Sequence, residues 1–301
     1  MSWHIENTMG IWRQKALSWL GMNSSAAVSF SQAVQDSLQA RRGRRARTLD
    51  EIRSICSRLM QRVPGLSTTQ VRHITRADCA VLVQTARTPR QQHKLRVILH
   101  GVFAHCVRQE WCRSNPAALL VPPLLSEQEI VPLNLEEIRQ LLNTARRWPH
   151  RACMPALGLM LWAGVRPAEV QRLQWGDIDW EDCVITLRPC HSKTGGCRHV
   201  QLQPVLRAWL HEHGLLEQGA ICPRNWQRRW RHLRQTAGLI PWRQDVLRHT
   251  FASYYVKHFH DYARLQEDMG HRSAALLRTR YLNMRGITAA HAARFWKAGA
   301  L

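Results

Sequence analysis

The sequence predicts a mainly α-helical protein with a small antiparallel β-sheet, divided into two modules. Apolar residues recur at spacings of three and four through most of the 301-residue chain, as they do in amphipathic helices. The segments 183-CVITLRP-189 and 198-RHVQLQP-204 instead resemble two strands, and they flank 193-KTGG-196, whose glycines suit a tight turn. The stretch 118–132 contains three prolines and no clear period, which predicts a linker between two helical regions.

The first module is predicted over residues 28–117 and consists of four helices. We expect them at 28–40, 48–60, 76–86 and 91–111. Thr88-Pro89 marks the start of the last helix, because threonine caps a helix N-terminus and proline fits the first turn. Residues 1–27 carry three tryptophans but little periodicity, and the sequence assigns them no role.

The second module is predicted over residues 133–301. Asn134 is expected to cap a helix over 135–148. The longest apolar run of the chain is about 14 residues, too short to span a bilayer. It therefore predicts a buried helix over about 151–163. A short helix at 167–173 and the strand pair follow, and the remainder is helical again.

The charge balance predicts a polyanionic partner. The chain has 43 Lys+Arg against 21 Asp+Glu, a formal net charge of +22, and such an excess repels itself unless an anion neutralises it. We expect double-stranded DNA; a membrane surface is disfavoured, because no basic amphipathic helix with a large apolar face stands out. The alternative for each residue taken singly is a solvated basic face. The candidate DNA contacts are Arg41, Arg42, Arg44, Arg45, Arg87, Arg90, Lys94 and Arg96.

The cysteines predict a reduced, cytoplasmic protein. There are nine, an odd number, and the sequence shows no signal peptide. The segment 190-CHSKTGGCRH-199 offers cysteine and histidine at metal-like spacing, but it lacks a second half of the CxxC type. We therefore expect no metal site and no cofactor.

Two basic residues of the second module could carry chemistry. Arg166 precedes Pro167 at a predicted helix start, where backbone N–H groups bind anions, and Glu169 could orient its guanidinium. Lys193 lies at the predicted hairpin tip, and an ammonium is a better proton donor than a guanidinium that never deprotonates. The ordinary alternatives are a surface arginine or ion pair, and a solvated lysine.

Further candidates lie near the C-terminus. Arg248 begins an apolar helix, where a buried charge needs a partner such as a phosphate. His271 and Tyr281 follow in 268-DMGHRSAALLRTRYLNM-284. A helical tyrosine is most often a core or boundary residue with its hydroxyl in water or on a partner.

In combination, these residues resemble those of the tyrosine site-specific recombinases, the phage integrase family. The order and approximate spacing agree for Arg166 in GVRPAEV, Lys193 in SKTGGCRHVQL, Arg248 in LRHTFASYY, His271 in MGH and Tyr281 in RTRYLN. The resemblance covers about 130–301 and, more loosely, the first module, which is similar to the family's SAM-like core-binding domain.

The resemblance implies that Tyr281 attacks a DNA phosphodiester, which forms a 3′-phosphotyrosyl link and frees a 5′-hydroxyl. Covalent capture conserves the bond energy, so rejoining needs neither ATP nor a metal. Positive charges next to a phenol favour its ionised form and stabilise the phosphorane-like transition state. The implied partners are Arg166 and Arg248 on the non-bridging oxygens, His271 on the phosphate, Lys193 as proton donor to the 5′-oxygen, and Glu169 as an orienting residue.

The chain departs from the family pattern at two points. Asp245 stands where the family usually has histidine; it could accept the proton of Tyr281 or hold Arg248, but it adds negative charge beside a phosphate. His249 is an alternative base. His271 and Tyr281 are ten positions apart, where nine are expected.

The resemblance also implies a two-module clamp around DNA and a tetramer on paired sites. The segment 286–301 is expected to form a helix that docks on a neighbouring subunit. Two alternatives remain open: a DNA-binding protein that keeps the recombinase scaffold with little or no cleavage, and a type IB topoisomerase, which shares the chemistry.

Overall fold

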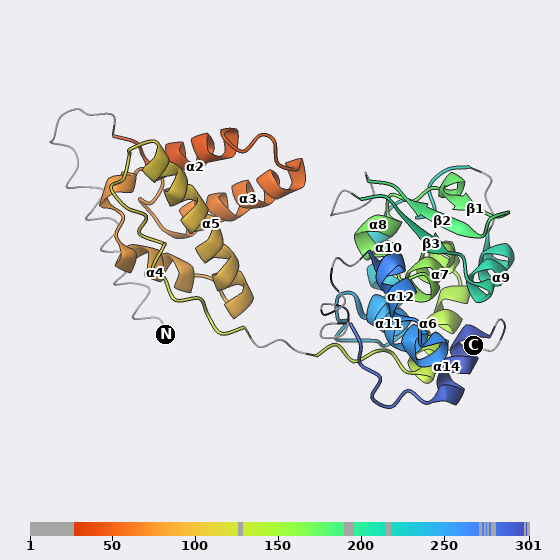
Figure 1. The fold of residues 1–301 in the computed structure, drawn as a ribbon. Helices are drawn as coiled ribbons and strands as arrows, with labels where there is room; N and C mark the ends of the chain where they lie inside the picture. The colour runs from red at the N-terminus through yellow and green to blue at the C-terminus, as the bar shows by residue number, and fades with distance from the viewer. Residues whose placement is uncertain are drawn as a thin grey trace. The chain divides into compact units, whose positions relative to one another are not determined.

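The fold divides into two compact units. The computed structural model describes residues 27–125, 129–189, 196–214, 218–270 and 281–297, with Ser273, Ala275, Leu277 and Gly299. The units are Met1–Glu127 and Gln128–Leu301, and each has its own hydrophobic core (Figure 1). The described residues are mostly helical with one three-stranded antiparallel sheet, which confirms the predicted fold class. None of the helices described here is long and apolar enough to cross a membrane.

The first unit is built from four described α-helices. They are α2 (Phe30–Gln39), α3 (Ala46–Arg62), α4 (Arg76–Gln84) and α5 (Pro89–Arg108), with a 3-10 turn η1 (Val71–His73). Helix α5 is central, because α2 and α4 both pack on it. Thr88 caps α5 as predicted, accepting from the N–H of Gln91 at 3.3 Å, and Pro89 occupies the first turn. The fully buried rings of Phe30 and Phe103, 6.2 Å apart, join α2 to α5.

Two buried helices form the centre of the second unit. Every residue of α7 (Met154–Trp162) is buried, which confirms the helix predicted from the apolar run. Helix α11 (Val246–Phe259) packs against it and is buried from Val246 to Val256. Gly164 lies just beyond α7 with φ +58°, and a Cβ at this position would come within 2.4 Å of Phe251 Cδ1. Only glycine therefore lets the end of α7 approach α11 this closely.

The remaining helices among the described residues of this unit surround that pair. They are α6 (Leu135–Arg146), η2 (Arg151–Cys153), α8 (Pro167–Val170), η3 (Trp175–Asp177), α9 (Pro204–His213), α10 (Trp226–Thr236), α12 (Tyr262–Met269) and α14 (Ala289–Trp296). Asn134 caps α6 as predicted: its Oδ1 accepts from the N–H groups of Glu136 and Glu137, both at 2.9 Å.

The sheet has the order β1 (Ile178–Asp179), β2 (Val184–Leu187) and β3 (Arg198–Gln201). The predicted pair of antiparallel strands is confirmed, with Ile185 opposite Val200, and the predicted turn lies mostly outside the described residues, which omit 190–195. The two-residue strand β1 was not predicted. Figure 1 shows the sheet on one side of the unit and α6, α11 and α14 on the other. Helix α12 packs on β3, so residues of the hairpin meet the end of a helix about 70 positions later in the chain.

Helix α14 packs within its own chain. Its buried residues Ala292 and Phe295 belong to the core of the unit, and the Phe295 ring lies 4.5 Å from that of Tyr254. The indole N–H of Trp296 donates to the carbonyl of Tyr254 at 3.2 Å, and that of Trp162 to the carbonyl of Phe295 at 3.1 Å. The apolar face that we expected to bind a neighbouring subunit is therefore occupied by α7 and α11. Helical spacing of apolar residues predicts a buried face but not which chain covers it.

Truncating Phe295 to alanine is expected to lower the free energy of unfolding by about 3–5 kcal/mol, because a fully buried ring leaves a cavity. Denaturant unfolding of the full chain measures this loss. The matched control is the exposed neighbour Arg294, whose substitution by alanine should change stability by less than about 0.5 kcal/mol. A loss below about 1 kcal/mol for Phe295→Ala would show that α14 is not part of the folded core.

Candidate active site

Arg166 and Glu169 form the first part of the site at the start of α8. Pro167 opens this helix as predicted and leaves Arg166 just before it. Glu169 is 1% exposed and points back to Arg166: its Oε1 accepts from Arg166 Nη1 at 2.9 Å and its Oε2 from the Arg166 backbone N–H at 3.1 Å. The Arg166 side chain is 22% exposed, whereas Glu169 is buried, so a ligand can reach Arg166 but not Glu169.

Arg198, which sequence reasoning did not single out, completes the surroundings of Glu169. Its Nη1 and Nη2 donate to Glu169 Oε1 and Oε2 at 3.0 and 2.6 Å, a forked pair. The Glu169 carboxylate thus accepts four hydrogen bonds, two from each arginine. Burial raises the pKa of Glu169, but the hydrogen bonds and charge of Arg198 and the charge of Arg166 outweigh burial and hold the pKa at about 2. Glu169 is therefore a fixed negative charge that orients guanidinium groups.

Arg248 lies in the first turn of α11. It is 1% exposed, and its guanidinium donates to the carbonyl oxygens of Gly164 and Met269. Burial and then the charges of Arg166 and Arg198 lower the pKa of Arg248 to about 9, which still leaves it protonated at neutral pH. An arriving anion would relieve this crowding of positive charge.

Tyr281 reaches the arginines from the C-terminal part of the chain. Its ring centroid lies 5.6 Å from Arg248 Cζ, and its ring stacks on that of His249 at 4.5 Å and 20°. Burial and the charge of Arg248 lower the pKa of His249 to about 4, so this imidazole is neutral at pH 7 and a weak proton acceptor. Ser253 supports the backbone here, because its Oγ lies 3.5 Å from the carbonyl of Tyr281.

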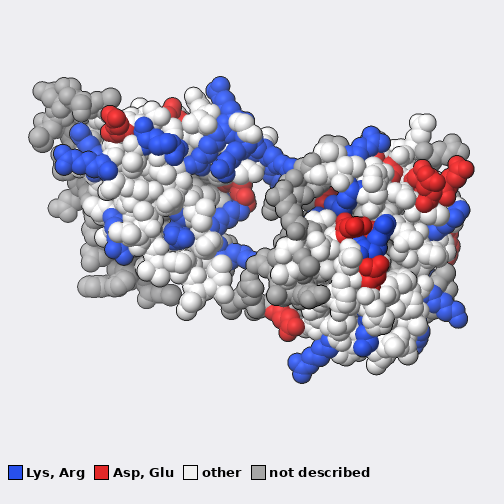
Figure 2. All heavy atoms as spheres, viewed as in Figure 1, with Lys and Arg blue, Asp and Glu red and all other residues white. Residues whose placement is uncertain are grey.

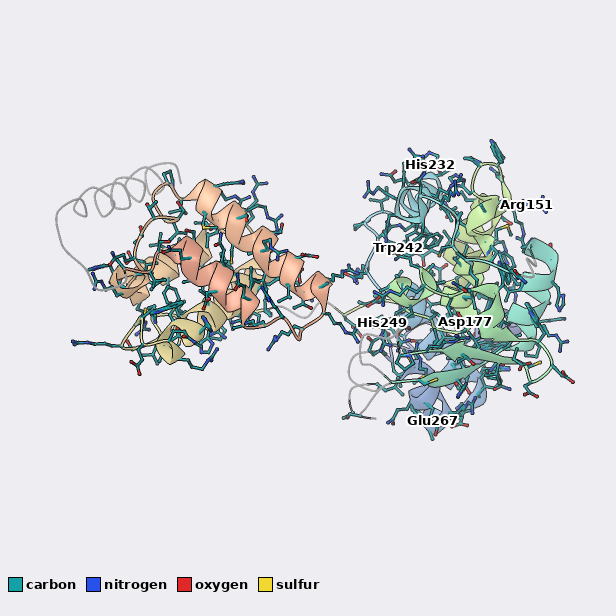
Figure 3. All side chains as sticks on the ribbon, turned by 90° about the horizontal axis from the view of Figure 1, so that it is seen from above. Arg151, Asp177, His232, Trp242, His249 and Glu267 are labelled. Atoms are coloured by element: carbon teal, nitrogen blue, oxygen red, sulfur yellow. The ribbon has the colours of Figure 1, made fainter. Side chains whose placement is uncertain are left out.

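Asp245 occupies the N-cap position of α11, one turn before His249, with φ +64° and ψ +10°. Its carbonyl accepts from the N–H of His249 at 3.0 Å. Figure 3 marks His249 on α11 and Glu267 in the last turn of α12.

Two predicted site residues, Lys193 and His271, lie outside the described residues.

The structure therefore brings together Arg166, Glu169, Arg248 and Tyr281, which are spread over 116 positions of sequence. Arg198 joins them although it was missed. Arg166 and Arg198 pair with the carboxylate of Glu169, and the charge of Arg248 is within electrostatic reach of all three. These described residues therefore carry a net positive charge beside a tyrosine ring. Such an arrangement can bind a phosphate diester and stabilise the extra negative charge of its transition state.

The predicted DNA contacts of the first unit fall into two groups. Figure 2 shows several patches of Lys and Arg side chains on one face of this unit, between larger areas of other residues. Three of the predicted residues are engaged within the unit: Arg41 donates to the carbonyl of Gly101, Lys94 pairs with Glu51, and Arg96 Nη1 donates to the carbonyl of Leu120 at 3.2 Å. The other five, Arg42, Arg44, Arg45, Arg87 and Arg90, are exposed, and so is the side chain of Lys94.

A groove of about 430 Å³ lies between α3 and α5. It brings Arg87 and Lys94 together with Arg58 and Arg62, two residues that the sequence did not single out, and Glu51 is the acidic residue among its lining. The excess of positive charge suits a phosphate backbone.

No cluster of three or more metal-ligating His, Cys, Asp or Glu side chains occurs among the described residues. The cysteine-histidine segment considered above begins at 190, and 190–195 lie outside them.

The comparisons with known proteins agree with this geometry. Residues 132–285 match the phage integrase family, about half of the chain, and the chain belongs to that family. It is 29% identical over 203 residues to the tyrosine recombinase XerC of Azotobacter vinelandii, covering 60% of this chain and 66% of that protein, just under two thirds of its length.

Two solved structures share the fold. One is a lambda integrase tetramer bound to a Holliday junction, with a TM-score of 0.70 and 16% identity, covering 93% of this chain and 87% of that one. The other is the Tn1549 transposon integrase in complex with a circular intermediate DNA, with a TM-score of 0.67 and 15% identity, covering 85% of this chain and 95% of that one.

Proposed function

We propose that this protein is a site-specific DNA recombinase that cuts a DNA strand and rejoins it to another strand through a covalent bond to Tyr281. The observation that carries the proposal is the 5.6 Å approach of the buried Arg248 guanidinium to the Tyr281 ring, beside the Arg166–Glu169–Arg198 cluster. Family membership and the DNA complexes of the two structural neighbours support it.

In the proposed reaction, the Tyr281 oxygen attacks the phosphorus and the bond from phosphorus to the 5′-oxygen breaks. The 3′ end of the cut strand stays on Tyr281, whose proton passes to Asp245 or His249, and the 5′-oxygen takes a proton from Lys193. Attack by another 5′-hydroxyl reverses these steps on a new strand. One phosphodiester replaces another throughout, so the chemistry consumes no ATP, and the protein's own cations take the place of a metal.

Arg166 and Arg248 are assigned to the two non-bridging oxygens of the scissile phosphate, with His271 as a third donor. Arg166 suits this role because it is partly exposed and its other side is held by Glu169. Arg248 suits it because two carbonyl contacts fix its guanidinium before DNA binds. Preorganised donors of this kind stabilise a transition state without reorganising during the reaction.

We assign residues 28–117 to a core-binding DNA-binding domain, 118–132 to a linker and 133–301 to the catalytic domain. The basic groove between α3 and α5 supports DNA binding by the first of these. We further propose a tetramer on paired sites, acting on DNA of a mobile element in the cytoplasm. The lambda integrase neighbour, a tetramer bound to a Holliday junction, and the transposon integrase neighbour support this proposal.

A covalent complex on DNA tests the function. Duplexes that tile the DNA flanking the gene are nicked at successive positions, so that some nicks lie close to the scissile phosphate. There the short 5′-hydroxyl fragment diffuses away and the adduct accumulates. The proposal predicts a complex of protein and DNA that survives denaturing detergent on at least one duplex. Binding without any adduct would favour the DNA-binding alternative. Relaxation of supercoiled plasmid without site preference and without recombination would favour a topoisomerase.

Replacing Asp245 by histidine is expected to keep the cleavage rate or raise it by up to about tenfold, because an imidazole can donate to a phosphate and the substitution removes a negative charge. Histidine is among the residues that tolerate the left-handed backbone found here, φ +64°. Single-turnover cleavage of the nicked duplex measures the change. Complete loss would instead assign Asp245 a specific role, such as proton acceptor.

A further inference from the structure

Arg198 links three separate segments around the site. Its Nη atoms form the forked pair with Glu169 of α8, and its Nε donates to the carbonyl of Asp268 at 2.9 Å. Asp268 lies in the last turn of α12, where backbone carbonyls have no partner within the helix. The guanidinium of Arg248 binds the carbonyl of the next residue, Met269. Two arginines thus hold consecutive carbonyls at the end of α12, directly before the segment with His271 and Tyr281.

Arg198 is more buried and more tightly packed than an ordinary surface arginine. Its side chain is 10% exposed, and Gly270 packs on its aliphatic part: a Cβ at Gly270 would lie 2.9 Å from Arg198 Cδ. Gly270 ends α12 with φ +62°, so the glycine allows both the left-handed turn and this contact. A buried guanidinium is costly unless its hydrogen bonds are satisfied, and Arg198 donates three, one to Asp268 and two to Glu169.

We propose that Arg198 is a positioning residue for strand cleavage: it fixes Glu169, which holds Arg166, and it fixes the end of α12, which leads to His271. This inference rests on the proposed function. Arg198 itself need not touch DNA. Its removal would free the carboxylate on one side and the helix end on the other, and both changes would displace groups assigned to the phosphate.

The positioning role predicts a specific pH dependence of the cleavage rate when Arg198 is removed. Three positive charges act on the Glu169 carboxylate or are acted on by it. They are Arg166 in the same turn, Arg198 in β3 and Arg248 in α11. Burial raises its pKa, and Arg198 is the largest influence that lowers it. Without Arg198 the pKa of Glu169 must rise. As pH falls through the raised value, the carboxyl takes up a proton and stops accepting from Arg166. The cleavage rate of a variant without Arg198, relative to that of the wild type, therefore falls further toward acid pH. In the wild type the pKa of about 2 keeps Glu169 ionised.

The test is the single-turnover cleavage rate of Arg198→Gln divided by that of the wild type, at saturating nicked duplex, between pH 8 and pH 5.5. We expect a loss of about tenfold at pH 8 that grows to about a hundredfold at pH 5.5, with DNA affinity changed by less than about threefold. Adding Glu169→Gln to the variant should abolish the pH dependence of this ratio, since no carboxyl is left to titrate.

Arg188→Gln is the control, because Arg188 directly follows β2 and pairs with a different buried carboxylate, Asp177 Oδ1 at 3.1 Å. It removes the same charge and should keep the cleavage rate within about threefold at every pH. If Arg198→Gln does not fold, as judged by thermal unfolding, Arg198→Lys replaces it. That variant keeps the charge but not the fork, and we expect about a tenfold loss with little dependence on pH.

A loss for folded Arg198→Gln that is the same at every pH, or cleavage by Arg198→Lys equal to that of the wild type, would overturn the positioning role. Failure of the proposed function is seen separately, because the wild type then forms no adduct on any duplex.

Discussion

Replacing Arg248 by alanine is expected to slow strand cleavage by at least about a thousandfold. The guanidinium is 1% exposed, lies 5.6 Å from the Tyr281 ring and is fixed by the carbonyls of Gly164 and Met269. In the proposed mechanism it stabilises the charge that develops on the phosphate oxygens in the transition state. Its loss removes this stabilisation. Single-turnover cleavage of the nicked duplex measures the reduction.

The same substitution is expected to destabilise the second unit by about 2–4 kcal/mol, because two buried carbonyls lose their donor. Arg248→Lys separates the two consequences. A lysine keeps a positive charge and can donate to a carbonyl, but it cannot reproduce the planar fork. We expect this variant to remain folded at 25 °C and to cleave about a hundredfold more slowly than the wild type. Cleavage by a folded Arg248→Ala protein within about tenfold of the wild-type rate would contradict the role assigned to this arginine.

Replacing Tyr281 by phenylalanine is expected to abolish the covalent adduct while leaving the fold and DNA affinity unchanged. Stacking on His249 and the approach of Arg248 involve the ring, which phenylalanine keeps. Only the hydroxyl is lost, and with it the nucleophile. Gel analysis under denaturing conditions measures the adduct, and binding to the same duplex is measured in parallel.

Tyr262 provides the control for this substitution. It is a half-buried tyrosine at the start of α12 that packs on the same small core as Tyr281. Tyr262→Phe should form the adduct at a rate within about threefold of the wild type. An adduct that persists in Tyr281→Phe would mean that another side chain is the nucleophile.

Much of the fold follows from local sequence rules. The caps at Thr88 and Asn134 and the buried helix α7 depend on residues within a few positions of one another, and all three were predicted. Strand β1 was missed because two residues, Ile178 and Asp179, are too few to show a period. Its formation depends on pairing with β2, which is a tertiary interaction.

The arginine network could not be read from the sequence in the same way. Arg198 opens a hairpin strand in which exposed and buried residues alternate, and an arginine there is usually exposed. Its partners are 29 positions earlier at Glu169 and 70 positions later at Asp268. Its burial is decided by the packing of α12 on β3. One chemical argument points to a second partner. If Glu169 is buried and paired with Arg166 alone, its carboxylate accepts only two of the four hydrogen bonds found in the structure.

The central claim is that Tyr281 forms the covalent bond to DNA, and peptide mapping of the trapped complex tests it most directly. The wild-type protein is trapped on the nicked duplex, digested with protease and nuclease, and analysed by mass spectrometry. The account predicts a single modified peptide that contains Tyr281 and carries a 3′-linked nucleotide, with a free 5′-hydroxyl on the released strand. A nucleotide attached to any other residue, or a 5′-linked nucleotide on Tyr281, would contradict it.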